Sequence, residues 1–173
     1  MKLLCAALSF SIFATAFSRP QETVKFLGFR ELGKYSGVNQ EGIEYEKTYY
    51  VSSYIKLAPP AARSFCKSYG MDLVSFESRN EYLVVRNKFE PELPRDKSIF
   101  VIVGGFAHVQ QNGKKIFHWI STGEKIFSGL EATGEEYCLG IKKEANEPVA
   151  FIPISCDETL KFMCQDMELQ YAN

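Results

Sequence analysis

The chain has 173 residues, of which 46% are hydrophobic and 14% aromatic, and this composition suits one folded domain with a packed core. Its 20 basic and 21 acidic residues leave a formal net charge of −1, and basic residues occur in runs of two at most. This balance argues against nucleic acid and against an anionic membrane as partners.

Residues 1–18 have the pattern of a secretory signal peptide. Lys2 precedes an apolar run, and the small residues Ala16 and Ser18 suit cleavage by signal peptidase. The run is shorter than the ~20 apolar residues that a spanning helix needs, and no second run of that length follows. We therefore predict a secreted, extracellular protein.

Removal of the signal peptide leaves four cysteines: Cys66, Cys138, Cys156 and Cys164. An even number of cysteines in a secreted domain indicates disulfides. Zinc is disfavoured because no two of these cysteines have the spacing of a zinc knuckle. Four cysteines allow three pairings, and their spacing does not choose among them.

The mature chain begins with a polar segment that is interrupted by glycines. Residues 19–44 are predicted to be a loosely structured lead-in, with one short strand near residues 24–29. The stretch 48–57 is rich in aromatic and β-branched residues, so it is predicted to be a strand.

Two helices are predicted next. Pro59 and Pro60 open the first helix, since proline suits the first helical turn, and Gly70 is placed to end it. Ser78 and Glu81 form a capping box at the start of the second helix. The apolar faces are Ala62, Phe65, Cys66 and Tyr69 in the first helix and Tyr82, Val85 and Phe89 in the second.

From Ser98 onward, short apolar runs alternate with turn residues. Strands are predicted at residues 99–105, 115–122, 136–141, 149–155 and 160–165. Because two helices precede most of the strands, the predicted fold class is α+β with an antiparallel sheet.

Several motifs follow one another in a recognisable order. An aromatic strand precedes a cysteine inside the first helix (AARSFCKSYGMDLVSF), a capped second helix (SFESRNEY), a Gly-Gly pair after a strand, the stretch FHWISTGEKI and a closing Cys-x7-Cys. In this order the motifs resemble the C-type lectin-like domain family, in particular its small secreted single-domain members. The resemblance implies a disulfide-stapled α+β domain with a loop region over residues 45–166, followed by a C-terminal tail over 167–173.

The resemblance also implies the disulfide pairing. Cys66 would bind Cys164 and tie the first helix to the last strand, while Cys138 would bind Cys156 and clamp the hairpin between them. Loop-closure entropy is worth about 3 kcal/mol for a short loop and about 4.7 kcal/mol for a loop of about a hundred residues. The long-range bridge should therefore contribute more to stability.

The loop before Cys138 lacks the first signature of a calcium-dependent sugar site. Family members that bind sugar through calcium have a Glu-Pro-Asn or Gln-Pro-Asp tripeptide in a long loop before the third cysteine from the end. Here that loop is short and contains no proline, and the Glu147-Pro148 pair follows Cys138 instead. We therefore interpret Glu147 and Pro148 as part of a hairpin turn.

The second signature of a calcium site is absent as well. In the family, an Asn-Asp pair follows a tryptophan shortly before the next cysteine, but counting back from Cys156 places Phe151 at the tryptophan and Ile152 and Pro153 at the Asn-Asp pair. Calcium needs six to eight oxygen ligands, and these side chains offer none. We therefore expect no calcium, no other metal and no cofactor.

No catalytic residue is predicted. The cysteines are expected to form disulfides, and no serine lies in a Gly-x-Ser-x-Gly setting. His108 is interpreted as a surface residue and His118, inside a predicted strand next to Trp119, as a packing residue. The protein is therefore expected not to be an enzyme.

The predicted binding face is the loop over residues 126–136. Its candidate ligand-binding residues are Phe127, Leu130, Glu131, Glu135 and Glu136. We predict a secreted interaction module that has lost the calcium-dependent sugar site and recognises a protein or another macromolecule. The alternative is a lectin that binds carbohydrate in an atypical or calcium-independent way, with a role in innate immune recognition. In a second interpretation of the loop, Phe127 and Leu130 only seal the core.

Overall fold

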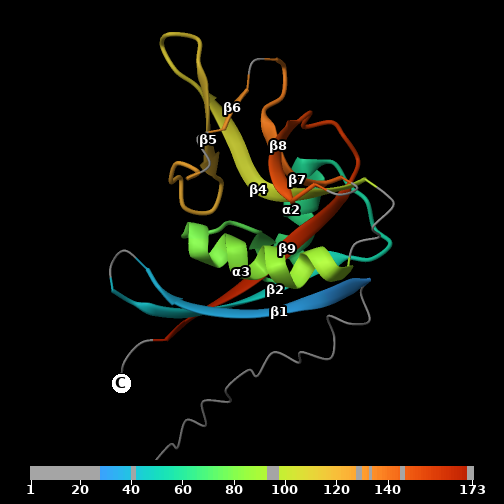
Figure 1. Ribbon diagram of the computed structural model, residues 1–173, viewed down its shortest axis with the longest axis vertical. Helices are drawn as coiled ribbons and strands as arrows, with labels where there is room; N and C mark the ends of the chain where they lie inside the picture. Colours follow the sequence, from blue (N-terminus) through green and yellow to red (C-terminus); the bar gives the residue numbers. More distant parts are fainter. Residues whose placement is uncertain are drawn as a thin grey trace, which may run out of the picture.

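The computed structural model describes residues 28–39, 42–92, 98–127, 130–132, 134–144 and 147–170. The elements in its first half are β1 (Phe29–Val38), β2 (Glu44–Ser52), α2 (Pro59–Ser68), β3 (Asp72–Leu73), α3 (Arg79–Phe89) and the 3-10 turn η1 (Glu90–Glu92). The second half contains β4 (Ile99–Val109), β5 (Lys115–Trp119), β6 (Glu131–Ala132), β7 (Cys138–Lys143), β8 (Ala150–Ile154) and β9 (Lys161–Gln170). The predicted α+β class is confirmed (Figure 1). Neither helix in the described residues has the length and apolar character needed to cross a membrane.

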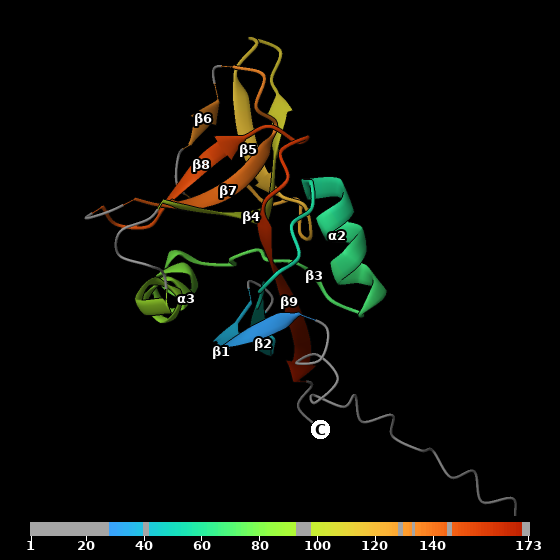
Figure 2. The ribbon, with the colours of Figure 1, turned by 90° about the vertical axis from the view of Figure 1, so that its right-hand side faces the viewer.

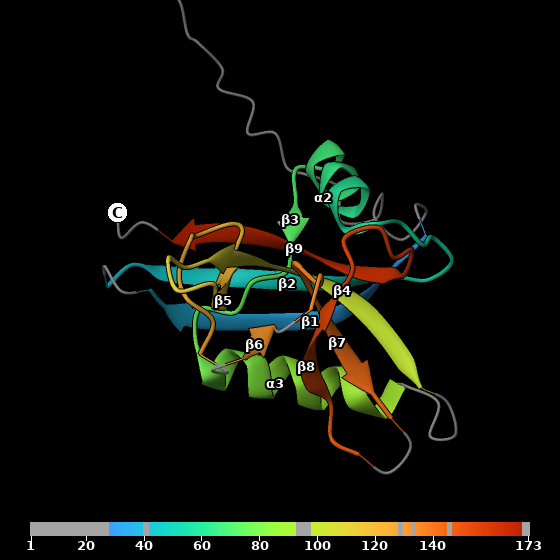
Figure 3. The ribbon, with the colours of Figure 1, turned by 90° about the horizontal axis from the view of Figure 1, so that it is seen from above.

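The strands form one continuous sheet in the order β1-β2-β9-β4-β5-β6, with β3 also on β9, and with β7 paired to both β4 and β8. All of these pairs are antiparallel except β4 with β9, which run parallel for two residue pairs. Figure 3 shows β1, β2 and β9 side by side, and Figure 2 shows α2 and α3 on opposite sides of these strands. The prediction of an antiparallel sheet therefore holds apart from this short parallel contact.

The sheet separates two hydrophobic cores. The main core contains residues of α3 and one face of the central strands, among them Tyr49, Phe76, Tyr82, Val101, Trp119, Phe151 and Met163. The second core surrounds α2 and the opposite face, with Phe29, Tyr50, Ala62, Ile102 and Phe162. Consecutive residues of the central strands thus enter different cores, because side chains alternate across a strand.

Several predicted segment boundaries differ from the structure. The strand predicted over residues 48–57 is β2, which begins at Glu44 and ends at Ser52. β1 lies inside the segment predicted to be a loose lead-in, and it pairs with β2 from Phe29 to Val38. The register shifts at Glu31, so the apolar residues Phe29 and Leu32 stand three apart and the alternation typical of a strand is missing from the sequence. At the other end, β9 continues to Gln170, through most of the predicted tail. The predicted signal peptide and residues 24–27 lie outside the described residues.

The first predicted helix is confirmed as α2. It begins at Pro59, and Gly70 follows its end with a φ of 74°, a value that favours glycine. Ala62 and Cys66 are completely buried on the predicted face, whereas Tyr69, at the end of that face, is 37% exposed. The face that the spacing predicts is therefore the face that meets the second core.

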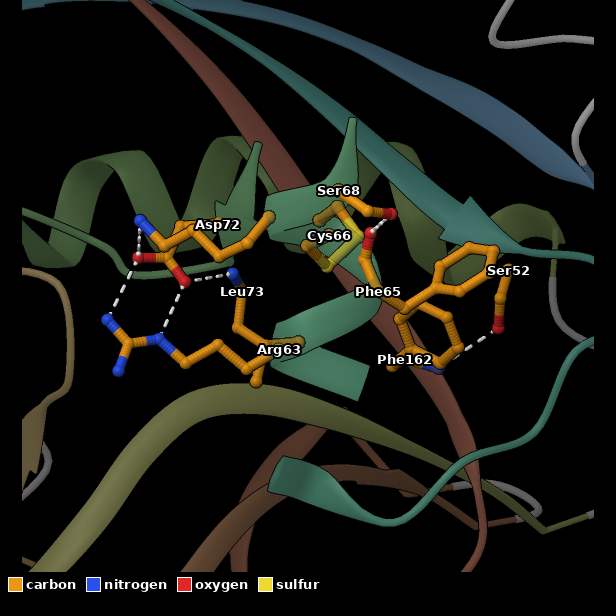
Figure 4. Close-up of a disulfide and its surroundings, with 10 residues drawn as sticks. Ser52, Arg63, Phe65, Cys66, Ser68, Asp72, Leu73 and Phe162 are labelled. Carbon is orange, nitrogen blue, oxygen red and sulfur yellow. Dashed lines mark hydrogen bonds and ion pairs between the residues drawn. A yellow bond between two sulfur atoms is a disulfide. The ribbon is translucent and has the colours of Figure 1, made fainter. Parts of the chain in front are cut away.

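Both disulfides that the resemblance implied are present. Cys66 binds Cys164 with a Cα–Cα distance of 5.7 Å across a sequence separation of 98, and joins α2 to β9 (Figure 4). Cys138 binds Cys156 across a separation of 18, from β7 to the segment after β8. The resemblance, and not the cysteine spacing, identified this one of the three possible pairings.

An ion pair beside the long-range disulfide holds α2 against β3. Arg63 donates two hydrogen bonds to the Asp72 carboxylate, at 3.0 and 3.2 Å, and Lys67 Nζ lies 2.9 Å from Asp72 Oδ2 (Figure 4). Burial alone would raise the pKa of Asp72, but the hydrogen bonds from Arg63 and Lys67 lower it. The carboxylate form of Asp72 is thus favoured where the helix meets the strand.

Glu81, in the first turn of α3, has a completely buried carboxylate with four hydrogen-bond donors. Its Oε1 accepts from Lys47 Nζ at 2.9 Å and from the Tyr49 hydroxyl. Its Oε2 accepts from the Tyr45 hydroxyl at 3.3 Å and from the Glu77 N–H at 2.6 Å. Burial and the neighbouring Glu81 carboxylate raise the pKa of the Tyr49 phenol, so this donor keeps its proton.

The capping box is confirmed in one half only. Ser78 Oγ accepts from the Glu81 N–H at 3.1 Å, as predicted. In a complete box the Glu81 carboxylate would return to the Ser78 N–H, but it accepts from Glu77 and from β2 instead. The contact with Lys47 and a hydrogen bond from the Glu77 N–H therefore replace the return bond to the Ser78 N–H.

Lys47 is as deeply buried as Glu81. Besides Glu81, its ammonium group donates to the Ser75 carbonyl and to the Glu77 carboxylate, each at 3.1 Å. All three donors of the ammonium group are therefore used. This network fixes α3 and the segment before it onto β2.

Removing the long-range disulfide should cost more stability than removing the short-range one. A Cys66→Ala/Cys164→Ala variant should lose about 2 to 5 kcal/mol of unfolding free energy, because the bridge constrains most of the unfolded chain. The measurement is urea denaturation of the mature protein, with Cys138→Ala/Cys156→Ala for comparison. A larger loss in the Cys138/Cys156 variant would contradict this ranking.

Replacing Glu81 with Gln should lower the unfolding free energy by about 3 to 5 kcal/mol, because the buried Lys47 ammonium loses its main counter-charge. Urea denaturation followed by circular dichroism measures this change. Lys34→Met is the matched control, since it breaks an exposed ion pair with Glu46 on the same sheet. The control should move the urea midpoint much less. A Glu81→Gln protein that unfolds at the wild-type urea concentration would refute the role given to this pair.

Candidate functional site

The predicted binding residues lie on the segment that joins β5 to β7. β6 pairs with β5, with Ala132 opposite Lys115 and Glu131 opposite Ile116, and so divides the segment into two parts. We call Ile126, Phe127 and Leu130 the inner stretch and residues 134–137 the tip. In Figures 1 and 2 the connection from β6 to β7, which contains the tip, lies beside the turn of the β4–β5 hairpin.

The inner stretch covers a group of aromatic side chains next to α3. Phe127 is 38% exposed, and its ring centroid lies 5.9 Å from that of Tyr82 and 6.0 Å from that of Phe151. Leu130 is partly buried against the main core. Phe127 therefore combines a packing contact with an exposed surface, whereas Leu130 belongs mainly to the core.

Tyr82 and Phe151 form the centre of this aromatic group. Their rings stack with centroids 4.6 Å apart, and the Tyr82 hydroxyl donates to the Val149 carbonyl at 2.9 Å. Burial raises the pKa of this hydroxyl, which keeps it protonated as the donor. Tyr82 thereby joins α3 to β8 directly beneath Phe127.

The tip is held by a lysine that the sequence analysis did not single out. Lys115 is only 8% exposed, and its ammonium group donates to the Gly134 carbonyl and lies 3.7 Å from the centroid of the Tyr137 ring. The Ala107 N–H donates to the Tyr137 carbonyl at 2.8 Å. Hydrogen bonds and a cation–π contact thus attach the tip to the β4–β5 hairpin.

The predicted acidic residues lie mainly at the tip. Glu135 is exposed and Glu136 is half-buried, next to Tyr137, which is 41% exposed. Glu131 lies in β6, and its side chain is outside the described residues. The structure therefore brings Glu135 and Glu136 together with Tyr137, and it places Phe127 and Leu130 in a separate patch beside α3.

β8 contains the three residues that the resemblance placed at the positions of the second calcium-ligand set. Phe151 is 9% exposed and belongs to the main core, and Ile152 packs against the second core. Pro153 pairs with Leu139 of β7. None of these side chains offers an oxygen. Within the described residues no group of three or more His, Cys, Asp or Glu side chains is placed to hold a metal ion.

Glu147 and Pro148 lie in the connection between β7 and β8, as predicted. Both are exposed. The Glu147 N–H donates to the Glu144 carbonyl at 3.2 Å, and Lys143 Nζ donates to the Glu147 carbonyl at 3.2 Å. These contacts are those of a turn between two paired strands.

The two histidines lie on the outer face of the β4–β5 hairpin. His108 is exposed and His118 is half-buried, whereas the neighbouring Trp119 is 2% exposed in the main core. His118 therefore packs at the surface of the hairpin and not in the core. The sequence could have predicted the outward position of His118, because adjacent residues in a strand face opposite sides of the sheet and the apolar Trp119 faces the core.

No family model matches the chain, and no curated protein sequence matches it. Solved structures do resemble it. The C-type lectin domain of murine dendritic cell inhibitory receptor 2, in complex with N-glycan, is 18% identical, with a TM-score of 0.54 over 70% of this chain and 91% of that chain. Human lithostathine is 16% identical, with a TM-score of 0.52 over 75% of this chain and 86% of that chain. A Ca2+-dependent type II antifreeze protein in its Ca2+-free form is 17% identical, with a TM-score of 0.51 over 69% of this chain and 91% of that chain.

These similarities cover most of each known domain at low sequence identity, so they bear on the fold. The chain has the C-type lectin-like fold.

Proposed function

We propose that this protein is a secreted, non-enzymatic binding module that recognises a protein or another macromolecule without calcium. One similar structure is a C-type lectin domain in complex with N-glycan, which supports a binding role for this fold. The predicted signal peptide supports secretion. The observation that carries the proposal is the apolar triplet of β8, Phe151, Ile152 and Pro153.

Apolar side chains at these three positions favour a ligand that is bound without metal. A calcium ion requires an oxygen-rich shell, and each apolar residue in that shell removes a ligand. Phe151 is also committed to the aromatic group that contains Tyr82 and Phe127, so its ring stabilises the fold. Any calcium site here would have to be built from other residues.

The tip is the surface that we assign to the partner. Glu135 and Glu136 supply negative charge, and the exposed part of Tyr137 supplies apolar area next to them. A tyrosine beside charged groups is a common composition for a binding surface. Because Lys115 holds the tip in place, little conformational entropy should be lost on binding.

A calcium-independent lectin is the second candidate. Exposed aromatic rings stack on sugar rings, and carboxylates accept hydrogen bonds from sugar hydroxyls. Tyr137, Glu135 and Glu136 offer both at the tip. Lys115 already occupies one side of the Tyr137 ring, and this favours the first proposal. One similar structure is a complex with N-glycan, which keeps the lectin as an alternative, including a role in innate immune recognition.

Reversing the charge of the tip should weaken partner binding and leave the fold intact. A Glu135→Lys/Glu136→Lys variant should change the unfolding free energy by less than about 0.5 kcal/mol, because Glu135 is exposed, Glu136 is only half-buried, and substitutions outside the core have small effects. Its association with the native partner should slow or weaken, because rim charges govern encounter. A quantitative pull-down from the native extracellular fluid, analysed by mass spectrometry, measures the recovered proteins.

The matched control is Asp157→Lys/Glu158→Lys, which makes the same charge change on two exposed residues outside the tip. It should recover the wild-type set of partners. If the tip variant recovers that set as well, the binding surface lies elsewhere. A glycan array probed with and without a chelator tests the lectin: signals that survive chelation would favour it, and signals that chelation abolishes would refute binding without calcium.

Millimolar calcium should leave the melting temperature unchanged, because an ion stabilises a protein only by binding its native state. Differential scanning calorimetry of the mature protein, with calcium chloride and with EDTA, provides the measurement. A calcium-dependent rise that disappears in a Glu135→Gln variant would reveal a calcium site at the tip and would overturn this part of the proposal.

A further inference from the structure

The two histidines of the chain lie next to each other in space, outside the tip. His108 is on β4 and His118 on β5, and the register pairs His108 with Ile116 and Phe106 with His118. The two histidines are therefore diagonal neighbours on one face of the hairpin. Their rings lie at the outer surface, on the face opposite the buried Phe117 and Trp119.

The separation of the two rings suits a shared metal ion. Their centroids are 5.3 Å apart. Two imidazoles that bind one ion at a metal–nitrogen distance of about 2.0 to 2.1 Å and a tetrahedral angle have centroids about 5 Å apart. The separation of the two rings is therefore close to that of a pair that binds one ion.

A backbone contact selects the tautomer of His118 that a metal requires. His118 Nδ1 lies 2.9 Å from the Gly123 carbonyl oxygen. A carbonyl only accepts, so Nδ1 is the donor, and Nε2 of the neutral ring has a free lone pair. Gly123 has a φ of 75°, a conformation that favours glycine and shapes the turn that presents this carbonyl. Histidines that bind metals commonly donate their second ring nitrogen to such an acceptor.

The second ring is also supported. The centroid of the Phe106 ring lies 4.7 Å from that of His108, on the same strand and the same face. This contact restricts the orientations of the exposed His108 ring. Two histidines with restricted rings lose less entropy on binding an ion than two free side chains would.

We propose that His108 and His118 form a two-histidine chelate for a late first-row divalent metal ion, such as Cu2+, Ni2+ or Zn2+. Imidazole suits these metals. No third His, Cys, Asp or Glu joins the pair among the described residues, so water completes the coordination shell. Lys125 pairs with His118 across a short bridge, and its positive charge makes the site weaker than one with a carboxylate ligand. The site is independent of the partner-binding function proposed for the tip.

Isothermal titration of the untagged mature protein with nickel chloride tests the proposal. The wild-type protein should bind one ion, with copper binding more tightly than nickel or zinc, and calcium should not compete, because it prefers oxygen ligands. The variants His108→Gln and His118→Gln should each weaken nickel binding more than about tenfold. Val109→Gln, which changes an exposed residue of the same hairpin, is the control and should keep the wild-type affinity.

Nickel binding that survives in either histidine variant would overturn the proposal, as would the absence of binding to the wild-type protein. Circular dichroism of each variant verifies that its fold is intact. If a variant does not fold, NMR of the wild-type protein decides the question. Substoichiometric nickel should broaden the imidazole signals of both histidines together, and broadening of one ring alone would refute a shared ion.

Discussion

The buried ion pair between Lys47 and Glu81 is the contact on which the arrangement of this fold depends most. Each charged group has lost its water, and each has gained a full set of hydrogen-bond partners within the protein. A pair of this kind adds little net stability compared with apolar residues, but a misplaced partner is very costly. Such a pair therefore favours one orientation of α3 on β2 over all others.

That orientation also positions the inner stretch beside α3. Tyr82 follows Glu81 in α3, so fixing Glu81 against β2 also fixes Tyr82 against Phe151 of β8. Phe127 rests on both rings. The inner stretch thus rests on the rings of Tyr82 and Phe151, and the position of Tyr82 depends on the buried ion pair with Lys47 of β2. The tip depends on a different contact, the one made by Lys115 on β5.

The same aromatic group explains how the fold accommodates an apolar β8. Here Phe151 contacts Tyr82, Trp119 and Phe127, so its surface is removed from water.

The sequence by itself determined the features that local physics controls. Proline and glycine marked the ends of α2, the spacing of apolar residues identified its buried face, and alternation located most strands. The number of cysteines indicated two disulfides, but their pairing came from a family resemblance. Five ligand-binding residues were predicted as one group, and the structure separates Phe127 and Leu130 from the acidic tip.

Tertiary structure decided the rest, because the remaining interactions join residues that are far apart in the chain. β1 lacks regular alternation and exists through its pairing with β2. Glu81 was predicted to cap its own helix, yet Lys47, 34 residues away, provides its main partner. The two histidines meet only because the register of β4 and β5 makes them diagonal neighbours. Sequence patterns report the local preferences of the backbone and the average burial of each residue, whereas a hydrogen bond or an ion pair depends on which distant side chain the folded chain brings within reach.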